Sequence, residues 1–194
     1  MIEVEIKLPV RDGEEIETKL LQAGFVYIGT VHEQDDYFTS AYRDLKERDE
    51  ALRIRSVRYL DGILAGQEST LLTFKGPKLD RISMSRMELE TEVGNSGVMS
   101  EILKSLGFFP VPAVVKTRKN YLLKCKNSRM TINGCVDRVD KLGVFLELEV
   151  ISEDERRKQP ALEQIEKILA GLDHSMEETT RNSYLSMLMG LEDR

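Results

Sequence analysis

The sequence predicts an α+β domain in which a mostly antiparallel sheet of about eight strands forms a barrel or sandwich, with helices packed outside. Two observations lead to this fold class. Segments that alternate apolar and charged residues recur along the chain, and the predicted helices each carry one apolar stripe that must cover a sheet face. With 194 residues, 41% of them hydrophobic, the chain can bury a sizeable core as one domain or two closely joined halves.

The strands are predicted from alternation with a period of two. In the opening segment I-E-V-E-I-K-L, apolar residues fall on one face and charged residues on the other, which indicates a strand over 2–8. The polar stretch 43–50 reads as a loop or a short turn of helix. The other predicted strands are 24–40, 51–60, 69–75, 85–93, 109–124, 129–138 and 142–150.

The helices are predicted from apolar stripes and from residues that begin and end helices. Asp12 is a typical N-cap residue, and Gly24 and Gly107 suit the left-handed conformation that follows a helix C-terminus. Ser175 and Glu178 have the spacing of a capping box. The predicted helices cover 13–23, 96–106, 160–170 and 176–189.

Composition argues against several classes of protein. No apolar run approaches the ~20 residues of a membrane span, and the N-terminus lacks a signal-peptide profile. We therefore expect a cytoplasmic location and no membrane partner. The net charge of −6 argues against nucleic acid as a partner, although a local basic cluster could still hold a small anion. The two cysteines and two histidines lack the spacing of a metal site.

The charges on the predicted strands are largely sorted by strand. Acidic residues alternate in E-V-E, R-M-E-L-E and F-L-E-L-E, whereas basic residues occupy A-L-R-I-R, T-F-K and V-V-K-T-R. Taken singly, each strand is typical of a sheet with one solvated face, and a solvated sheet with no site is one alternative. Because the helices need the apolar face, closure of the sheet would turn the charges inward, where they must be paired or hold a ligand.

The two sets of charges together suit a polyphosphate and its metal ions. Glu-x-Glu on a strand places two carboxylates roughly 7 Å apart on one face, and Mg²⁺ and Mn²⁺ prefer oxygen ligands. Arginine offers bidentate contacts to phosphate oxygens, and lysine offers a point charge. The sequence therefore predicts a charged channel that binds a triphosphate with divalent metal.

These motifs, read in order, resemble a known family. E-V-E-I-K at residues 3–7 is similar to the E-x-E-x-K signature of the CYTH superfamily, the triphosphate tunnel metalloenzymes. The segments that follow in the family's order are D-D-Y-F, A-L-R-I-R, T-F-K-G, R-M-E-L-E, V-V-K-T-R, C-V-D-R, F-L-E-L-E and R-N-S-Y. The resemblance implies a single CYTH domain over 1–194, and H-E-Q-D-D-Y-F and R-x-S-Y look closest to the class IV adenylyl cyclase-like branch.

The resemblance implies an eight-stranded antiparallel β-barrel, the triphosphate tunnel, and gives its site residues. The residues implied to hold phosphates are Lys7, Arg53, Arg55, Lys75, Lys116, Arg118 and Arg181. Arg181, on the last predicted helix, would close one tunnel end, and Lys7, Arg55 and Lys116 are the expected catalytic residues. The residues implied to hold Mg²⁺ or Mn²⁺ are Glu3, Glu5, Glu90, Asp137, Glu147 and Glu149.

Alternatives to these roles stay open. Each acidic residue could instead be a structural partner of a tunnel arginine or lysine, and the same holds for Glu88. Tyr37 and Tyr121 are expected to pack or to form hydrogen bonds rather than to catalyse a reaction. A homodimer through an outer strand or the C-terminal helices is also left open.

The leading functional hypothesis is an enzyme that acts on a nucleoside triphosphate or inorganic triphosphate. In the cyclase reaction, the ribose 3′-hydroxyl of ATP attacks the α-phosphorus and gives cyclic AMP and pyrophosphate. The first alternative is a triphosphatase, in which water attacks inorganic, nucleoside or thiamine triphosphate. The absence of Trp is a mild argument against thiamine triphosphate, because a thiamine ring stacks well on indole. The second alternative is a non-catalytic module that binds nucleotide or polyphosphate.

Overall fold

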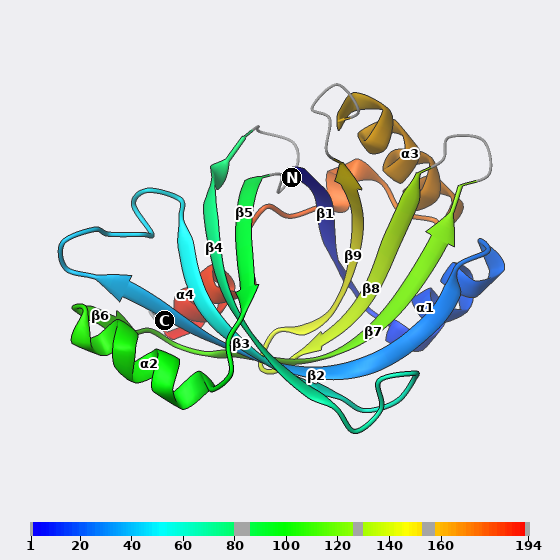
Figure 1. The fold of residues 1–194 in the computed structure, drawn as a ribbon. Helices are drawn as coiled ribbons and strands as arrows, with labels where there is room; N and C mark the ends of the chain where they lie inside the picture. Colours follow the sequence, from blue (N-terminus) through cyan, green and yellow to red (C-terminus); the bar gives the residue numbers. More distant parts are fainter. Residues whose placement is uncertain (1, 80–85, 126–129, 153–157, 193–194) are drawn as a thin grey trace.

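The chain folds as a curled antiparallel sheet with most of its helices on its outer side, in a computed structural model that describes residues 2–79, 86–125, 130–152 and 158–192 (Figure 1). The strands are β1 (Ile2–Val10), β2 (Val26–Ser40), β3 (Ala51–Tyr59), β4 (Glu68–Lys78), β5 (Arg86–Glu92), β6 (Phe108–Pro110), β7 (Val114–Lys124), β8 (Thr131–Val139) and β9 (Gly143–Ser152). The α-helices are α1 (Gly13–Gln22), α2 (Ser96–Ser105), α3 (Lys158–Gly171) and α4 (Tyr184–Glu192). The predicted α+β class is confirmed.

Eight of the described strands form a ring of antiparallel pairs. The order is β2, β3, β4, β5, β1, β9, β8 and β7, and β7 pairs again with β2. The predicted eight-stranded antiparallel barrel is therefore confirmed. Within the described residues β1 meets β5 through one residue pair, Ile2 with Met87, whereas it pairs with β9 from end to end. The short strand β6 extends the end of β2 and stands outside the ring.

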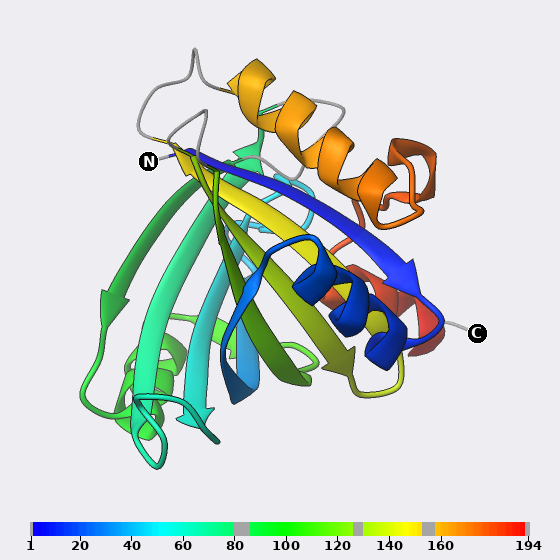
Figure 2. The ribbon, with the colours of Figure 1, turned by 90° about the vertical axis from the view of Figure 1, so that its right-hand side faces the viewer.

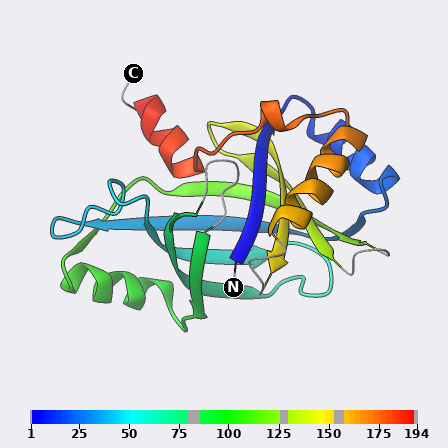
Figure 3. The ribbon, with the colours of Figure 1, turned by 90° about the horizontal axis from the view of Figure 1, so that it is seen from above.

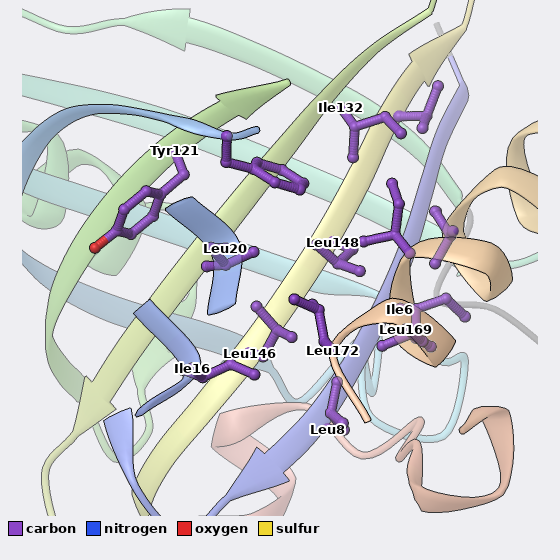
Figure 4. Packing of buried hydrophobic residues seen from close by; sticks show 14 of the residues in the cluster. Ile6, Leu8, Ile16, Leu20, Tyr121, Ile132, Leu146, Leu148, Leu169 and Leu172 are labelled. Carbon is purple, nitrogen blue, oxygen red and sulfur yellow. The ribbon is translucent and has the colours of Figure 1, made fainter. Parts of the chain in front are cut away.

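The main hydrophobic core lies outside the ring, between β1, β8 and β9 and the helices α1 and α3 (Figure 2). Figure 4 shows Ile6, Leu8 and Leu148 from the strands beside Leu169 and Leu172 of the α3 region. These five side chains are between 0 and 2% exposed, so this sheet face is dry. The apolar rows predicted from the sequence thus face the helices, and the charged rows of the same strands face the inside of the ring.

A second, smaller core lies under α2. Leu103 of this helix packs with Phe38 of β2 and Ile54 of β3, all buried. The helix therefore covers the outer face on the side of the barrel away from α1 and α3, as Figure 1 shows. With both sides covered from outside, the inner surface carries the charged side chains and, where α4 packs, a third apolar cluster of Tyr37, Val114, Val139, Phe145, Tyr184 and Leu188.

The ends of the first two helices follow the predicted capping residues. The Asp12 carboxylate accepts hydrogen bonds from two backbone N–H groups of the first turn of α1, at 2.9 and 3.2 Å. Gly24 has a φ of +92°, and the Phe25 N–H donates to the Leu20 carbonyl at 3.0 Å, which completes a Schellman motif. Gly107 has a φ of +90° just beyond α2. These glycines let the chain turn from helix into strand.

The expectation of one strand over 109–124 is wrong. The structure has β6 ending at Pro110 and β7 beginning at Val114, with a break between them. Pro112 lies in this break, and proline has no N–H to donate to a strand ladder. The chain therefore leaves the short pairing with β2 before it enters the barrel as β7.

The expectation of one helix over 176–189 is also wrong. The structure has a short 3₁₀ helix, Met176–Glu178, in which the Glu178 carboxylate accepts from the Ser175 N–H at 2.7 Å. An extended segment follows, in which the Thr180 N–H donates to the Lys7 carbonyl at 2.8 Å. This bond to β1, and the low helix propensity of adjacent threonines, end the helix before α4 begins.

The C-terminal helix α4 lies apart from α1 and α3. Seen from above, it begins beside the sheet and its C-terminal end points away from the sheet (Figure 3). Its contacts are mainly with β7. None of the described helices is both long and apolar enough to cross a membrane. A cytoplasmic location stays a prediction.

Replacing Leu148 by alanine tests the outer core. Leu148 is 0% exposed, so the substitution removes buried apolar surface and leaves a cavity. We expect the free energy of unfolding to fall by about 2–5 kcal/mol in denaturant titrations. The matched control is Leu21→Ala on α1, where the side chain is 53% exposed and the expected change is within about 0.5 kcal/mol. Similar losses in both variants would contradict this description of the core.

Candidate functional site

The inner face of the ring carries the predicted charged rows around a cavity of about 660 Å³. Asp137 lies behind the cavity lining, and the side chain of Glu3 lies outside the described residues. The structure thus brings most of the predicted phosphate and metal residues together. Those that line the cavity are Glu5, Lys7, Arg53, Arg55, Lys75, Glu90, Lys116, Arg118, Glu147, Glu149 and Arg181.

Arg55 is held by a buried carboxylate on the neighbouring strand. Asp35 of β2 and Arg55 of β3 are direct cross-strand partners, and Asp35 is 2% exposed. The guanidinium forms a bidentate pair with this carboxylate, at 2.6 and 2.7 Å. A second acidic residue, Glu33, lies 3.3 Å from another guanidinium nitrogen of Arg55. A planar fork held in this way can move little, so Arg55 is fixed before any ligand arrives.

Asp137 holds an arginine of β7 in place, as Asp35 holds an arginine of β3. It is fully buried, and Arg118, its cross-strand partner, binds both carboxylate oxygens at 2.7 and 2.6 Å. One of these oxygens also accepts from Lys116 at 2.9 Å and from the Tyr184 hydroxyl at 3.1 Å. A metal role for Asp137 stays a prediction. The contacts of this structure are those of an anchor for two cations.

Lys7 lies on β1 among acidic neighbours. Its ammonium is 3.2 Å from the Glu147 carboxylate, which also pairs with Arg118, and 3.7 Å from that of Glu5. Lys7 is only 4% exposed. Since Glu147 is directly opposite Lys7 in the β1–β9 register, the pairing follows from the strand alignment itself.

Arg53 is held more loosely than Arg55 or Arg118. Its closest acidic neighbours, Asp35 and Glu88, are 3.4 and 3.8 Å from guanidinium nitrogens. The Nε–H of Arg53 is buried and has no hydrogen-bond partner among the described residues. A buried donor without an acceptor is costly, so the position of Arg53 suits an anion that enters the cavity.

The remaining wall is formed by β4 and β5. The Lys75 ammonium lies 2.8 Å from the carboxylate of Glu88, its cross-strand partner. Glu90 accepts a hydrogen bond from the Thr73 hydroxyl at 2.9 Å. Arg181 also reaches the cavity, but it lies in the extended segment before α4 rather than on a helix as expected.

The arrangement keeps the buried acids ionised. Burial raises the pKa of Glu33, but Arg55 and Lys116 outweigh this effect and lower it to about 2. Burial also opposes ionisation of Asp35, whose pKa is nevertheless held well below its ordinary value by Arg55. The pKa of Glu147 is likewise lowered against burial, by Arg118 and Lys7. At neutral pH the cavity wall is therefore a lattice of ion pairs.

The carboxylates of the cavity fit a divalent metal that is shared with a phosphate ligand. Glu5 and Glu149 are direct cross-strand partners on β1 and β9, and both line the cavity. Among the described residues, no group of three or more acidic, histidine or cysteine side chains is arranged to hold a metal by itself. Mg²⁺ commonly binds through one or two carboxylates and completes its shell with phosphate oxygens and water, which is what this pair offers.

Three residues of this site were missed as site residues in the sequence. Glu33 and Asp35 alternate with His32 and Gln34 on β2, so the period of two along H-E-Q-D would have revealed an acidic row. Tyr184 belongs to the R-N-S-Y motif, but nothing in the sequence places it beside Lys7 and Lys116. Tyr37 and Tyr121, expected to pack, are both buried in core clusters.

The family model of the CYTH domain matches residues 1–184. The chain belongs to the CYTH family. A curated protein from Methanocaldococcus jannaschii named "Putative adenylate cyclase MJ0240" is 38% identical to it over 187 residues, which is 96% of this chain and 98% of that protein. This relation spans nearly the whole of both chains.

Two solved structures show the same fold. The PH1819 protein from Pyrococcus horikoshii superposes with a TM-score of 0.83 at 36% identity, and the match covers 99% of each chain. A protein from Hippeastrum, HpAC1, described as a putative adenylyl cyclase with a dominant triphosphatase activity, has a TM-score of 0.60 at 17% identity. That match covers 97% of this CYTH chain and 95% of HpAC1, and at this identity it shows the fold alone.

The lowered pKa values predict how stability depends on pH. A carboxylate whose pKa is lower in the folded than in the unfolded state stabilises the fold above its unfolded pKa, and this contribution is lost as pH falls through the folded pKa. We expect the free energy of unfolding to fall between about pH 5 and pH 2, by on the order of 3 kcal/mol from Glu33 alone. Denaturant titrations across this range measure it. Constant stability from pH 6 to pH 3 would contradict the ion-pair lattice.

Proposed function

We propose that this chain is a metal-dependent enzyme that acts on a triphosphate bound in the charged tunnel, and that it converts ATP to cyclic AMP and pyrophosphate. The observation that carries the proposal is the convergence of the predicted cations on one cavity, where the buried Nε–H of Arg53 has no acceptor in the part of the chain that the structure describes. Phosphate oxygens would supply that acceptor. The name of the Methanocaldococcus jannaschii relative supports the cyclase reaction.

The size and lining of the cavity support a nucleotide over inorganic triphosphate. Its volume of about 660 Å³ lies in the range of pockets that enclose small organic ligands. Leu45, Val111 and Leu185 contribute apolar surface to the lining, and none of the three belongs to a strand. A triphosphate chain has no use for such surface, whereas a base and ribose do.

The cations of the tunnel bind the phosphates in this proposal. Arg55 and Arg118 are fixed by Asp35 and Asp137, so they present their remaining N–H groups without reorganisation. The other phosphate ligands are Lys7, Arg53, Lys75, Lys116 and Arg181. A positively charged wall of this kind stabilises the charge that builds on the phosphates in the transition state.

The acids of the tunnel hold the metal in this proposal. Glu5 and Glu149 are the primary ligands, with Glu147, Glu90 and Glu3 as further ones, and the ion is Mg²⁺ or Mn²⁺. A bound divalent ion would neutralise phosphate charge and lower the pKa of an attacking hydroxyl group. The ribose 3′-oxygen then bonds to the α-phosphorus while the bond from the α-phosphorus to the bridging oxygen of the β-phosphate breaks. Pyrophosphate leaves, and the hydroxyl proton passes to solvent.

Triphosphate hydrolysis is the second candidate. The same cations and acids would bind the substrate, and water would replace the ribose hydroxyl as the attacking group. The dominant triphosphatase activity described for HpAC1, a protein of the same fold, supports this alternative. The two reactions differ in which phosphorus lies beside the attacking oxygen.

Product analysis distinguishes these functions. The protein is incubated with ATP or with inorganic triphosphate, with Mg²⁺ or Mn²⁺, and cyclic AMP, pyrophosphate and orthophosphate are separated. We expect cyclic AMP and pyrophosphate in equal amounts from ATP. Orthophosphate without cyclic AMP would assign a hydrolase, and metal-dependent binding without turnover would leave a non-catalytic binding module. A protein that neither binds nor turns over either compound would overturn the proposal.

Glutamine variants test the metal ligands. Glu147→Gln and Glu149→Gln keep the side-chain shape but remove a negative oxygen, so we expect metal-dependent turnover to fall by about 100-fold or more. The matched control is Glu17→Gln, since Glu17 pairs with Lys119 on the outer side of the barrel. Its turnover should be unchanged. If both cavity variants fold normally and keep the wild-type rate and metal dependence, these two residues do not hold the metal.

A further inference from the structure

Tyr184 is a buried aromatic residue that forms part of the cavity wall although it belongs to a helix and not to the sheet. It is the first residue of α4 and is 6% exposed. The extended segment before it is tied to β1 by the hydrogen bond from the Thr180 N–H to the Lys7 carbonyl. This bond fixes where α4 begins, and it delivers the Tyr184 ring to the side chains of the cavity.

The ring of Tyr184 lies against the two buried lysines. The Lys7 ammonium is 4.0 Å from the ring centroid, and the Lys116 ammonium is 5.3 Å from it. Both distances fall within the range of cation–π attraction, which strengthens where water is excluded. Phe145 also contacts the ring edge-to-face, with centroids 5.0 Å apart, and so restrains its tilt.

The hydroxyl of Tyr184 belongs to the same network. It donates to Asp137 at 3.1 Å, and the same carboxylate oxygen accepts from Lys116 at 2.9 Å. Burial, together with the nearby Glu147 and Asp137, raises the pKa of Tyr184, so the hydroxyl stays protonated and acts as a donor. One side chain thus contacts two cations through its ring and their acidic anchor through its hydroxyl.

We propose that Tyr184 is a positioning residue, which holds the ammonium groups of Lys7 and Lys116 toward the cavity so that they meet a triphosphate. This rests on the proposed function of the tunnel. Lys7 lies between the carboxylates of Glu5 and Glu147, and Lys116 lies between Glu33 and Asp137. The ring offers each lysine an attractive surface that no carboxylate provides and that a phosphate does not need to displace.

A double-mutant cycle tests the proposal. Binding of inorganic triphosphate with Mg²⁺ is measured by calorimetry for the wild type, Tyr184→Leu, Lys7→Gln and the double variant. We expect Tyr184→Leu to weaken binding by about 10- to 30-fold, from the strength of a desolvated cation–π contact. In the Lys7→Gln background, the same change should cost much less, because the nearer of the ring's two lysine partners is gone. Equal losses in both backgrounds would mean that Tyr184 only packs, and would overturn the proposal.

Two further variants separate the contribution of the ring to affinity from that of the hydroxyl. Tyr184→Phe keeps the ring, so we expect a loss of only about threefold in affinity. Tyr121→Phe is the matched control, because it removes a hydroxyl from a buried tyrosine in the outer core, away from the cavity. It should leave affinity unchanged. A Tyr184→Phe variant as weak as Tyr184→Leu would contradict the role of the ring.

A measurement without ligand separates this inference from the proposed function. The ring should shift the NMR resonances of the Lys7 ε-methylene group upfield, in the wild type and in Tyr184→Phe, and the shift should vanish in Tyr184→Leu. If the wild type binds no triphosphate but shows this shift, the proposed function fails while the placement of Lys7 by Tyr184 stands. If the wild type shows no such shift, the inference fails whatever the protein binds.

Discussion

The structure depends on the pairing of opposite charges between neighbouring strands inside a closed sheet. Three such pairs are direct cross-strand partners in the ring: Arg55 with Asp35, Arg118 with Asp137, and Lys7 with Glu147. Any one of these groups would be costly to bury alone. Because the register is fixed along whole strands, the cost of each charge is offset by a partner that cannot drift away.

These pairs do not by themselves make the protein stable. Buried ion pairs often contribute no more than apolar residues of the same volume, because removing two charges from water is expensive. Most of the apolar side chains that stabilise the fold lie on the other face of the same strands, against α1, α3 and α2, and a smaller cluster that includes Phe145 and Tyr184 lies at α4. The outer face of the sheet therefore carries most of the apolar core, whereas the inner face holds the charged residues in place beside a smaller apolar cluster at α4.

Holding charge in place is what a phosphate site requires. Arg55 and Arg118 are already oriented by their anchors, so a ligand would find donors that need little rearrangement. Arg53 is the contrasting case, since its ion-pair contacts are longer and its Nε–H has no acceptor among the residues described in the structure. Tyr184 adds a third arrangement, in which an aromatic ring supports two lysines without neutralising them. The cavity thus combines arginines that carboxylates hold in place, an arginine with a donor group left free by the described residues, and two lysines that contact an aromatic ring.

The sequence by itself determined the strands, the first two helices and the direction of the charged rows, because alternation with a period of two and capping residues act locally. It could not place the breaks at Pro112 and Thr180, where a short pairing with β2 and a bond to β1 compete with local preference. Nor could it separate a carboxylate that anchors cations from one that faces the cavity: Asp137 and Glu149 look alike in a strand pattern. Only the tertiary structure put four donors around Asp137 and set Glu149 facing the cavity, because burial and partners depend on which strands become neighbours.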